Sequence, residues 1–209
     1  VRTDANARRK NSRPPKASLL IAHGVHEYSG RYAHVVEFLV ARDYAVFTLD
    51  HRGHGHSEGL RGYVPDPHQA ADDLGRVFDS VRGEYPGNKF FILGHSMGSM
   101  ITMLFVLQRQ AELDGWITSG SPLNLSERAL PGEITIGRAL RPLLGKVRQR
   151  AIPPDAVWRE SDVILRYADD PLFYQGPVRM ATALAIVDGV EYARDRLPAE
   201  IVEVFNTPA

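Results

Sequence analysis

The residues with the clearest chemical meaning are Gly94-His95-Ser96-Met97-Gly98, which fit the pattern Gly-x-Ser-x-Gly. This pattern is typical of a serine nucleophile held at a sharp turn between a buried strand and a helix. A serine at the tip of such a turn is strained, and the two glycines leave room where the strand and the helix approach closely. The start of the helix favours the negative charge that develops when the serine attacks a carbonyl carbon.

The elements that must position this serine are visible in the flanking sequence. Residues 89–93 form a short apolar run rich in strand-forming residues, and residues 99–110 carry apolar side chains at helical spacing. The alternative, a chance match on an ordinary turn, does not account for the strand and the helix. We therefore expect Ser96 to stand above the end of the strand as an activated nucleophile.

Further strands alternate with helices through the first part of the chain. The expected strands, each a continuous run of mostly apolar residues, are 17–22, 44–49, 89–93 and 115–119. Buried runs separated by helices predict a parallel sheet that is covered on both faces. In such sheets the reactive groups lie in loops at the carboxyl ends of the strands. Here these loops open at His23, Asp50, His95 and Ser119.

One of these helices has a recognisable start. Asp66-Pro67 supplies a capping side chain followed by proline at the first helical position. Apolar residues then recur with a period of 3.6 up to Val81, while Asp72 and Asp73 are predicted on the opposite, solvated face.

Composition excludes several classes of protein. The 209 residues carry 25 basic and 25 acidic side chains, which argues against nucleic acid as the main partner. There is no cysteine, so disulfides and thiolate chemistry are excluded. No apolar run is long enough to suggest a membrane span. Residues 1–16 are polar and lack the apolar core of a secretory signal, so we expect a mobile leader and a cytoplasmic location.

A zinc site is one hypothesis for the histidine-rich loop after the second strand. His51, His54 and His56 are suitable ligand types. Gly53 and Gly55, however, indicate a tight loop, and no carboxylate-rich helix with ligand spacing accompanies it. We therefore expect no metal.

Four stretches of the chain carry motifs that belong together. They are His23-Gly24-x-x-Glu27-x-Ser29-Gly30-Arg31-Tyr32, Asp50-His51-Arg52-Gly53-His54-Gly55-x-Ser57-x-Gly59-x-Arg61-Gly62, Gly94-His95-Ser96-Met97-Gly98 and Asp169-Asp170-Pro171-Leu172. Together they resemble the monoacylglycerol lipases and bacterial lysophospholipases of the α/β-hydrolase fold, over about residues 17–209. Tyr28 departs from the pattern, because the family usually has histidine there.

The resemblance implies a set of site residues. It gives Ser96 as the nucleophile and the backbone N–H groups of Val25 and Met97 as the oxyanion hole. Donors of this kind stabilise the negative oxygen of a tetrahedral intermediate, and losing one raises the barrier by about 3–4 kcal/mol. His23 is implied to be a structural partner of its loop and not the general base. No cofactor is implied.

The domain organisation follows from the same resemblance. The expected parts are a mobile leader (1–16), the first part of the hydrolase core (17–121), a helical lid (122–176) and an incomplete return to the core (177–209). Within the lid, Ile134–Val147 carries apolar residues on one face and basic residues elsewhere. We expect this face to pack over the core, and contact with an anionic membrane is the alternative. The two are compatible if the lid is also the entry for lipid.

A serine nucleophile also needs a base and a carboxylate that orients it. In α/β-hydrolases these follow the serine in the order Asp or Glu, then His, whereas all eight histidines of this chain precede Ser96. The triad Asp and His are therefore expected beyond residue 209, in two further strand–helix units of about 30 residues each. The expected fold is a parallel α/β-hydrolase sheet with helices on both faces and an inserted lid, lacking its last strands.

Three interpretations remain open, and the first is the one we favour. The chain is a fragment of an active hydrolase, or an impaired remnant that binds a lipid or a protein, or an enzyme that uses an upstream histidine as base. Alone, it is expected to hydrolyse esters very poorly and to expose an apolar sheet edge that favours self-association.

The expected parent activity is hydrolysis of a lipid carboxylic ester, a monoacylglycerol or lysophospholipid, through an acyl-enzyme on Ser96. A related esterase, thioesterase, acyltransferase or peptidase is the alternative among enzymes. The expected partners are a small lipid ester and, through the lid, the surface of a membrane.

Overall fold

The computed structural model describes most of the chain, in four stretches: residues 2–4, 14–124, 132–148 and 170–198. Three segments of the expected lid and of the expected return to the core lie outside the described residues: 125–131, 149–169 and 199–209.

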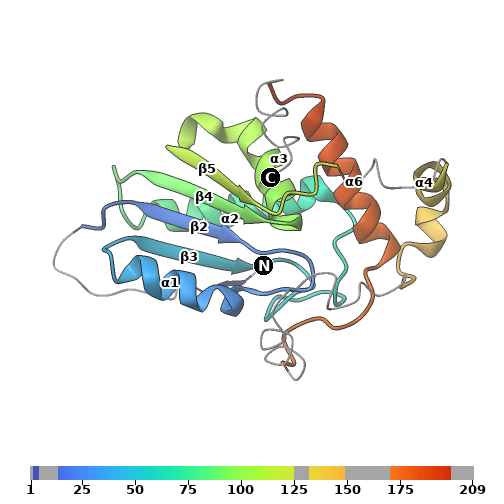
Figure 1. Ribbon diagram of the computed structural model, residues 1–209, viewed down its shortest axis with the longest axis horizontal. Coiled ribbons are helices and arrows are strands. Elements are labelled where there is room, and N and C mark those ends of the chain that lie inside the picture. The colour runs from blue at the N-terminus through green and yellow to red at the C-terminus, as the bar shows by residue number, and fades with distance from the viewer. Residues whose placement is uncertain (1, 5–13, 125–131, 149–169, 199–209) are drawn as a thin grey trace.

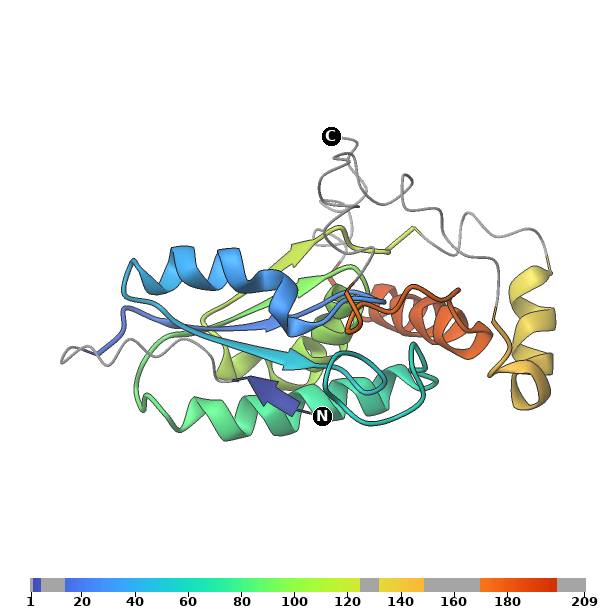
Figure 2. The same cartoon turned by 90° about the horizontal axis from the view of Figure 1, so that it is seen from below.

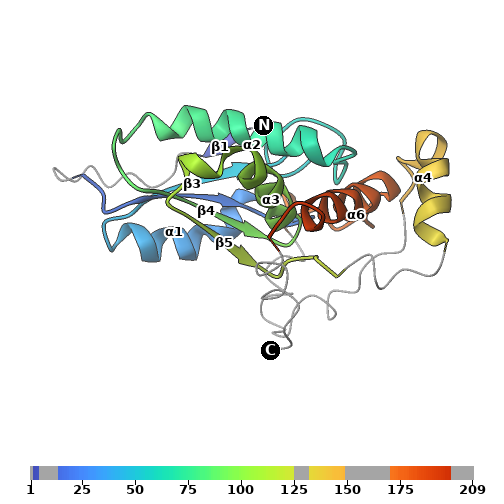
Figure 3. The same cartoon turned by 90° about the horizontal axis from the view of Figure 1, so that it is seen from above.

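A five-stranded sheet forms the centre of the molecule, with strand order β1-β3-β2-β4-β5. Figure 1 shows β3, β2, β4 and β5 side by side, and Figure 3 also labels β1. The strands are β1 (Arg2–Asp4), β2 (Ser18–Ala22), β3 (Ala45–Asp50), β4 (Phe90–His95) and β5 (Gly115–Ser119). Neighbouring strands from β3 to β5 run parallel, as the alternation of strands and helices predicted. Their carboxyl ends therefore lie at one edge of the sheet.

The middle of the sheet is buried because its strands are apolar on both faces. Leu20 of β2 pairs with Phe47 of β3 on one side and with Ile92 of β4 on the other. All three side chains are buried. Strands that are covered on both faces favour such continuous apolar runs over an alternating pattern.

Strand β1 was not predicted from the sequence. It lies within the expected leader and pairs antiparallel with β3, placing Arg2 opposite Asp50 and Asp4 opposite Thr48. A segment of three residues carries too little pattern to be recognised by periodicity.

Helices cover both faces of the sheet. They are α1 (Ala33–Val40), α2 (Pro67–Arg82), α3 (Met97–Arg109), α4 (Glu133–Leu144) and α6 (Met180–Arg194), with short 3-10 turns η1 (Ser29–Tyr32) and η2 (Gln110–Glu112). Helix α1 lies on one face and α2 and α3 lie on the other, as Figure 2 and Figure 3 show from two sides. Helix α6 packs against α3, and α4 lies beyond α6, away from the sheet.

Helix α2 begins as predicted. The side chain of Asp66 accepts hydrogen bonds from the backbone N–H groups of His68 (2.9 Å) and Gln69 (3.2 Å), and Pro67 is the first helical residue. The apolar stripe predicted for this helix is buried, with Leu74 and Phe78 fully inside the core. The cap and the stripe thus fix the start and the rotation of the helix together.

One of the two predictions for surface carboxylates on α2 was wrong. Asp73 is buried, because Arg52 from the loop after β3 (2.5 Å) and Arg76 (2.8 Å) bind its carboxylate, whereas Asp72 is exposed as expected. A periodic pattern places a residue on a helix face, but it does not reveal a loop that covers that face.

Helix α6 is tied to the loop that follows β3. The hydroxyl of Thr182 donates to the carbonyl of Gly62 (2.8 Å) and accepts from the N–H of Val64 (2.9 Å). The buried Arg179 donates to the carbonyls of Arg61 (2.9 Å) and Lys146 (2.6 Å). These bonds join the end of α4, the β3 loop and the start of α6 into one unit.

Candidate active site

Ser96 stands at the corner between β4, which ends at His95, and α3, which begins at Met97. Its backbone has φ 51° and ψ −119°, a conformation that residues with a Cβ atom rarely adopt. The side chain is half-buried, so it can still be reached from outside. The strained strand–turn–helix corner predicted from the sequence is therefore present, and strain of this kind is characteristic of functional sites.

The glycines on either side of the corner are required by close approach. A Cβ atom on Gly94 would lie 2.5 Å from the carbonyl oxygen of Gly98 and 2.5 Å from Oγ1 of Thr102. A Cβ atom on Gly98 would fall against the carbonyl oxygen of Ala22 at the end of β2. Both positions must therefore lack a side chain if β4, α3 and β2 are to meet at this point.

Main-chain hydrogen bonds hold the corner in place. The N–H of Ser96 donates to the carbonyl of Ser119 at the end of β5 (2.9 Å). The carbonyl of Ser96 accepts from the N–H (2.9 Å) and the hydroxyl (2.6 Å) of Ser99. Ser96 is thus anchored to the sheet on one side and to the first turn of α3 on the other.

The loop after β2 passes directly over the corner. A Cβ atom on Gly24 would lie 3.1 Å from Cβ of Ser96, so the backbone of this loop touches the serine. Val25, the next residue, is half-buried, and Met97 is buried. Within the described part of the chain, neither the N–H of Val25 nor that of Met97 has a hydrogen-bond acceptor. The corner therefore combines a hydroxyl with backbone donors that have no acceptor.

Two carboxylates fasten the loop, and sequence reasoning assigned a role to neither. Oε2 of Glu27 accepts the N–H of Gly24 (3.0 Å). Asp50, at the end of β3, accepts the N–H of Ser29 (2.7 Å) and the N–H of His56 (2.8 Å). Both residues stand in the motifs that carry the family resemblance, and this was the signal that could have identified them.

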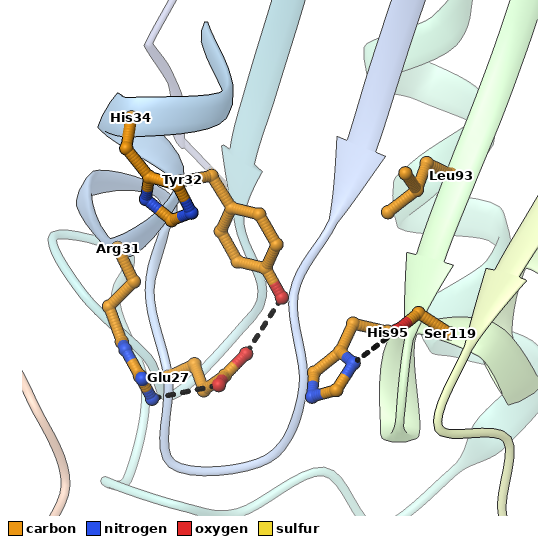
Figure 4. Close-up of a pocket in the computed structure, with 7 residues that line it drawn as sticks. All are labelled: Glu27, Arg31, Tyr32, His34, Leu93, His95 and Ser119. Carbon is orange, nitrogen blue, oxygen red and sulfur yellow. Dashed lines mark hydrogen bonds and ion pairs between the residues drawn. The ribbon is translucent and has the colours of Figure 1, made fainter. Parts of the chain in front are cut away.

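A cavity of about 250 Å³ lies beside the corner, on the face of the sheet that carries α1 (Figure 4). It is lined by Glu27, Arg31, Tyr32, His34, Leu93, His95 and Ser119. Oε1 of Glu27 pairs with Arg31 (2.8 Å), and Nδ1 of His95 lies 3.3 Å from the hydroxyl of Ser119. The cavity thus has charged and polar groups next to Ser96.

Three histidines of the first two loops, His23, His51 and His54, are buried. Nδ1 of His23 donates to the carbonyl of Gly24 (2.7 Å), and its Nε2 accepts the N–H of His51 (3.0 Å). The rings of His51 and His54 lie 4.5 Å and 5.4 Å from that of His23. Burial lowers the pKa of all three, that of His54 to about 3. His23 is therefore a structural tie between two loops, as the resemblance implied.

The described residues contain no group of three His, Asp or Glu side chains placed to hold a metal ion. His51 and His54 are buried, whereas His56 is exposed, so the three do not converge on one point. All eight histidines lie within the described residues, and none of them hydrogen-bonds to Ser96 there. Among the described residues, no histidine therefore makes the hydrogen bond to Ser96 that a general base requires.

Residues at the end of the expected lid contact the same loop. The hydroxyl of Tyr28 donates to Asp170 (2.5 Å), and the N–H of Tyr174 donates to the carbonyl of His26 (3.0 Å). His26 itself has a φ of 71°, and burial lowers its pKa to about 4. Tyr28, the departure from the family pattern, thus serves as a tie between the loop and the Asp169-Asp170-Pro171-Leu172 motif.

Helix α4 is oriented opposite to the expectation. Its charged face meets α6, where Arg138 and Arg141 each reach Asp188 at 2.7 Å. Its apolar residues point outward, with Ile136 62% and Leu143 82% exposed. The prediction that this face packs over the core was therefore wrong for the described residues, because ion pairs with α6 decide the orientation.

The sequence of this chain matches a known protein family and several known lipases. The family model described as serine aminopeptidase, S33, matches residues 13–205. The chain is 32% identical over 186 residues to the monoglyceride lipase of Homo sapiens, covering 88% of this chain and 61% of that protein. It is 29% identical over 173 residues to a monoacylglycerol lipase of Mycolicibacterium smegmatis, covering 83% of this chain and 62% of that protein.

The fold agrees with solved structures. The crystal structure of a monoacylglycerol lipase from Paleococcus ferrophilus superposes with a TM-score of 0.75 at 24% identity, over 87% of this chain and 69% of that one. The chain spans about three fifths of the length of the two relatives above. The matched residues include the strained corner at Ser96 and the loop that carries Val25. The chain therefore belongs to the serine aminopeptidase S33 family and has the α/β-hydrolase fold.

Proposed function

We propose that this protein hydrolyses a carboxylic ester of a small lipid, a monoacylglycerol or lysophospholipid, through an acyl-enzyme on Ser96. The observation that carries the proposal is the strained backbone of Ser96 directly beneath the loop that carries Val25. The similarity to lipases of monoglycerides supports the substrate class.

In the proposed reaction Oγ of Ser96 attacks the ester carbonyl and passes its proton to a general base. The carbonyl oxygen becomes an oxyanion and accepts hydrogen bonds from the N–H groups of Val25 and Met97. The alcohol leaves with the proton from the base, and the acyl group stays on Ser96. Water then attacks the acyl-enzyme by the same route and releases the fatty acid.

The base is the part of this mechanism that the chain's own histidines do not supply. In the proposal it is a histidine, oriented by an aspartate, from outside the 209 residues. Support comes from two facts: every histidine precedes Ser96, and none hydrogen-bonds to it among the described residues. Loss of a catalytic histidine lowers kcat by about 10⁶ in a comparable triad, so the chain alone should turn over esters at a rate near background.

Chemical rescue by imidazole tests in the 209-residue chain whether Ser96 is the nucleophile and whether its base is missing. Imidazole in solution should replace the base and raise hydrolysis of p-nitrophenyl butyrate, and Ser96→Ala should abolish the rise. Imidazole also cleaves this ester directly, so the Ser96→Ala protein measures that background, and Ser80→Ala on the exposed side of α2 serves as the matched control. A rise equal in Ser96→Ala and wild type would refute the nucleophile, and fast Ser96-dependent turnover without imidazole would refute the external base.

The substrate class needs its own test. A series of monoacylglycerols and lysophospholipids from short to long acyl chains should show activity rising with chain length in the imidazole-rescued protein. A preference for short esters, thioesters or peptides would instead favour a related esterase, thioesterase or peptidase.

A second candidate function is lipid or protein binding by a catalytically impaired remnant. It is favoured by one observation, that no histidine is bound to Ser96 among the described residues. A fluorophosphonate probe separates the two candidates, because labelling of Ser96 requires an activated nucleophile. No labelling with imidazole present would favour the binding module.

We further propose that α4 contacts the membrane surface from which substrate enters. None of the helices in the described part of the chain has the length and hydrophobicity of a membrane-spanning segment. The exposed Leu143 and Val147 lie next to the exposed Lys146 and Arg148, a combination that suits an anionic lipid surface. Leu143→Asp should weaken flotation with anionic vesicles, and Phe38→Asp, at an exposed apolar residue on α1, should not.

The proposal also includes self-association of the isolated chain through β5. This strand has one neighbour, β4, among the described strands, and Ile117 is 47% exposed. An open edge with exposed apolar residues favours pairing with another copy. Ile117→Lys should shift sedimentation toward the monomer, and a wild-type chain that stays monomeric at high concentration would contradict this.

A further inference from the structure

The loop that carries the Val25 donor has no regular secondary structure, so its donor must be aimed by specific contacts. Stabilisation of an oxyanion depends on a donor that is already in place, and a displacement of about 1 Å can cost roughly 100-fold in rate. Val25 follows Gly24, which as a glycine can rotate more freely than any other residue. The question is therefore which group holds the peptide planes on either side of Gly24.

The plane between Gly24 and Val25 is held through its carbonyl. The Gly24 oxygen accepts Nδ1–H of His23 (2.7 Å) and the backbone N–H of Glu27 (3.4 Å). In a trans peptide the C=O and the following N–H point in opposite directions within one rigid plane. Fixing the Gly24 carbonyl thus fixes the direction in which the Val25 N–H points.

The plane before Gly24 is held by the side chain of the same glutamate. Oε2 of Glu27 accepts the Gly24 N–H at 3.0 Å. Glu27 therefore grips Gly24 at both its N–H and its carbonyl, which removes the rotational freedom of the glycine. A Cβ atom on Gly24 would lie 3.2 Å from Oε2 of Glu27 and 3.1 Å from Cβ of Ser96, so the glycine is enclosed between the carboxylate and the serine.

The carboxylate is itself immobilised, as Figure 4 shows. Oε1 accepts from Nη1 of Arg31 (2.8 Å), and Oε2 also accepts from the hydroxyl of Tyr32 (2.8 Å). Burial disfavours ionisation of Glu27, but Arg31, the nearby His95 and these hydrogen bonds outweigh it and lower its pKa. The buried Glu27 carboxylate is thus an anion that accepts from three fixed donors. Such charge-assisted hydrogen bonds hold it in one position, and we call its contact with Gly24 the Glu27 clamp.

We infer that Glu27, held by Arg31 and Tyr32, is a positioning residue. It directs the Val25 N–H toward the oxyanion that forms when Ser96 attacks the substrate. It acts through Gly24 and does not touch the substrate. The inference rests on the proposed function for its catalytic consequence, whereas the clamp on Gly24 can be tested in the absence of any activity.

The first experiment reads the clamp directly in the 209-residue chain by NMR. At neutral pH the Gly24 amide resonance of wild type should lie downfield, as expected for a donor to a charged carboxylate, and hydrogen exchange of this amide should be slow. Glu27→Gln should shift this resonance upfield and speed the exchange at least tenfold, because a neutral amide oxygen is a weaker acceptor than a carboxylate. Glu37→Gln, at an exposed glutamate on α1, is the matched control and should change neither.

The second variant guards against loss of folding. Tyr32→Phe deletes one donor to the carboxylate and leaves the charge pair with Arg31 intact, so it should fold and give an exchange rate between those of wild type and Glu27→Gln. Unchanged exchange and an unchanged resonance position of the Gly24 amide in both variants would overturn the inference.

The third experiment measures separately the maximal rate of Ser96 labelling and the reversible binding of the probe. With imidazole present, Glu27→Gln should lower the maximal rate of fluorophosphonate labelling of Ser96 by about 10- to 100-fold, because the phosphoryl oxygen uses the same donors. The reversible binding constant of the probe should stay within twofold. An unlabelled wild type with a slowly exchanging Gly24 amide would reject the proposed function and keep the Glu27–Gly24 contact, whereas normal labelling of Glu27→Gln would reject the positioning role.

Discussion

Helix α2 buries its apolar stripe against the sheet and α3, whereas α4 turns its apolar residues outward and meets α6 with arginines. Both helices have the amphipathic pattern of a surface helix. In α2 the buried side chains include Leu74 and Phe78, while in α4 no residue is buried. An amphipathic pattern therefore predicts that a helix has two faces, but the partner decides which face is used.

The difference has a physical cause. Helix α2 borders strands and a helix that are apolar, so burial of carbon surface decides its orientation. Helix α4 borders α6, whose exposed side carries Asp188 and Glu191, so the ion pairs with Arg138 and Arg141 decide instead. Partly exposed ion pairs contribute little each, so the α4 contact should be much weaker than the α2 contact.

Low pH should have the largest effect, and it should act on the part of the molecule around the sheet. The buried histidines all lie in the loops after β2 and β3, whereas α4 and α6 contain no histidine. Burial lowers the pKa of His26 to about 4 and of His54 to about 3, from 6.5. The unfolded chain then binds more protons than the folded one below pH 6.5, so stability falls as pH falls. The expected loss is on the order of 5 kcal/mol between pH 6.5 and 4.5, seen as a falling Tm. A constant Tm across this range would contradict it.

Truncation of a core residue in α2 should have the next largest effect. Phe78 is fully buried and packs against the rings of Phe90 (centroids 4.9 Å apart) and Phe105 (5.1 Å). Phe78→Ala should lower the free energy of unfolding by about 3–5 kcal/mol, through lost burial and a cavity. Urea denaturation followed by circular dichroism measures it, and a loss below 1 kcal/mol would show that the core collapses around the gap.

Removal of one arginine from α4 should cost less. Arg141 contacts Asp188 and the carbonyl of Pro65, and its side chain is partly exposed. Arg141→Ala should destabilise the α4 contact by about 1 kcal/mol, and high salt should reduce the difference from wild type. Proteolysis of native protein within α4 reports this detachment, with Arg42→Ala on the far side of the molecule as control. Equal cleavage in both variants would show that the ion pairs do not hold α4.

The smallest effect is expected at the outward face of α4. Leu143 is the most exposed of the large apolar side chains described, so Leu143→Ala should change the free energy of unfolding by less than about 0.5 kcal/mol. The same urea experiment used for Phe78→Ala measures it. A loss comparable to that of Phe78→Ala would mean that this face is covered in solution.

The parts of the molecule that were predictable from sequence are those fixed by local rules. The Asp66-Pro67 start of α2 needs only a cap and a proline, and the corner at Ser96 needs only two glycines and a strand before a helix. Strand β5 was also placed correctly at Gly115–Ser119, since a short apolar run between turns is itself the signal.

The parts that were missed depend on distant partners. Asp73 is buried by Arg52 from another loop, and the outward face of α4 is set by Asp188. Glu27 lies only three residues from Gly24, yet its contact with that N–H depends on a loop conformation that no periodicity describes. Sequence reasoning thus located the strained corner at Ser96 and the family, but not the charged side chains that hold the surroundings of this corner.

The hydrogen bond from the Ser96 N–H to the Ser119 carbonyl joins the strained corner to β5, the outermost parallel strand among the described residues. That strand therefore holds the backbone of Ser96, the proposed nucleophile. Fraying of β5 will loosen the backbone of Ser96, and any strand that docks on β5 will stiffen it. The stability of β5 therefore affects how rigidly the backbone of Ser96 is held.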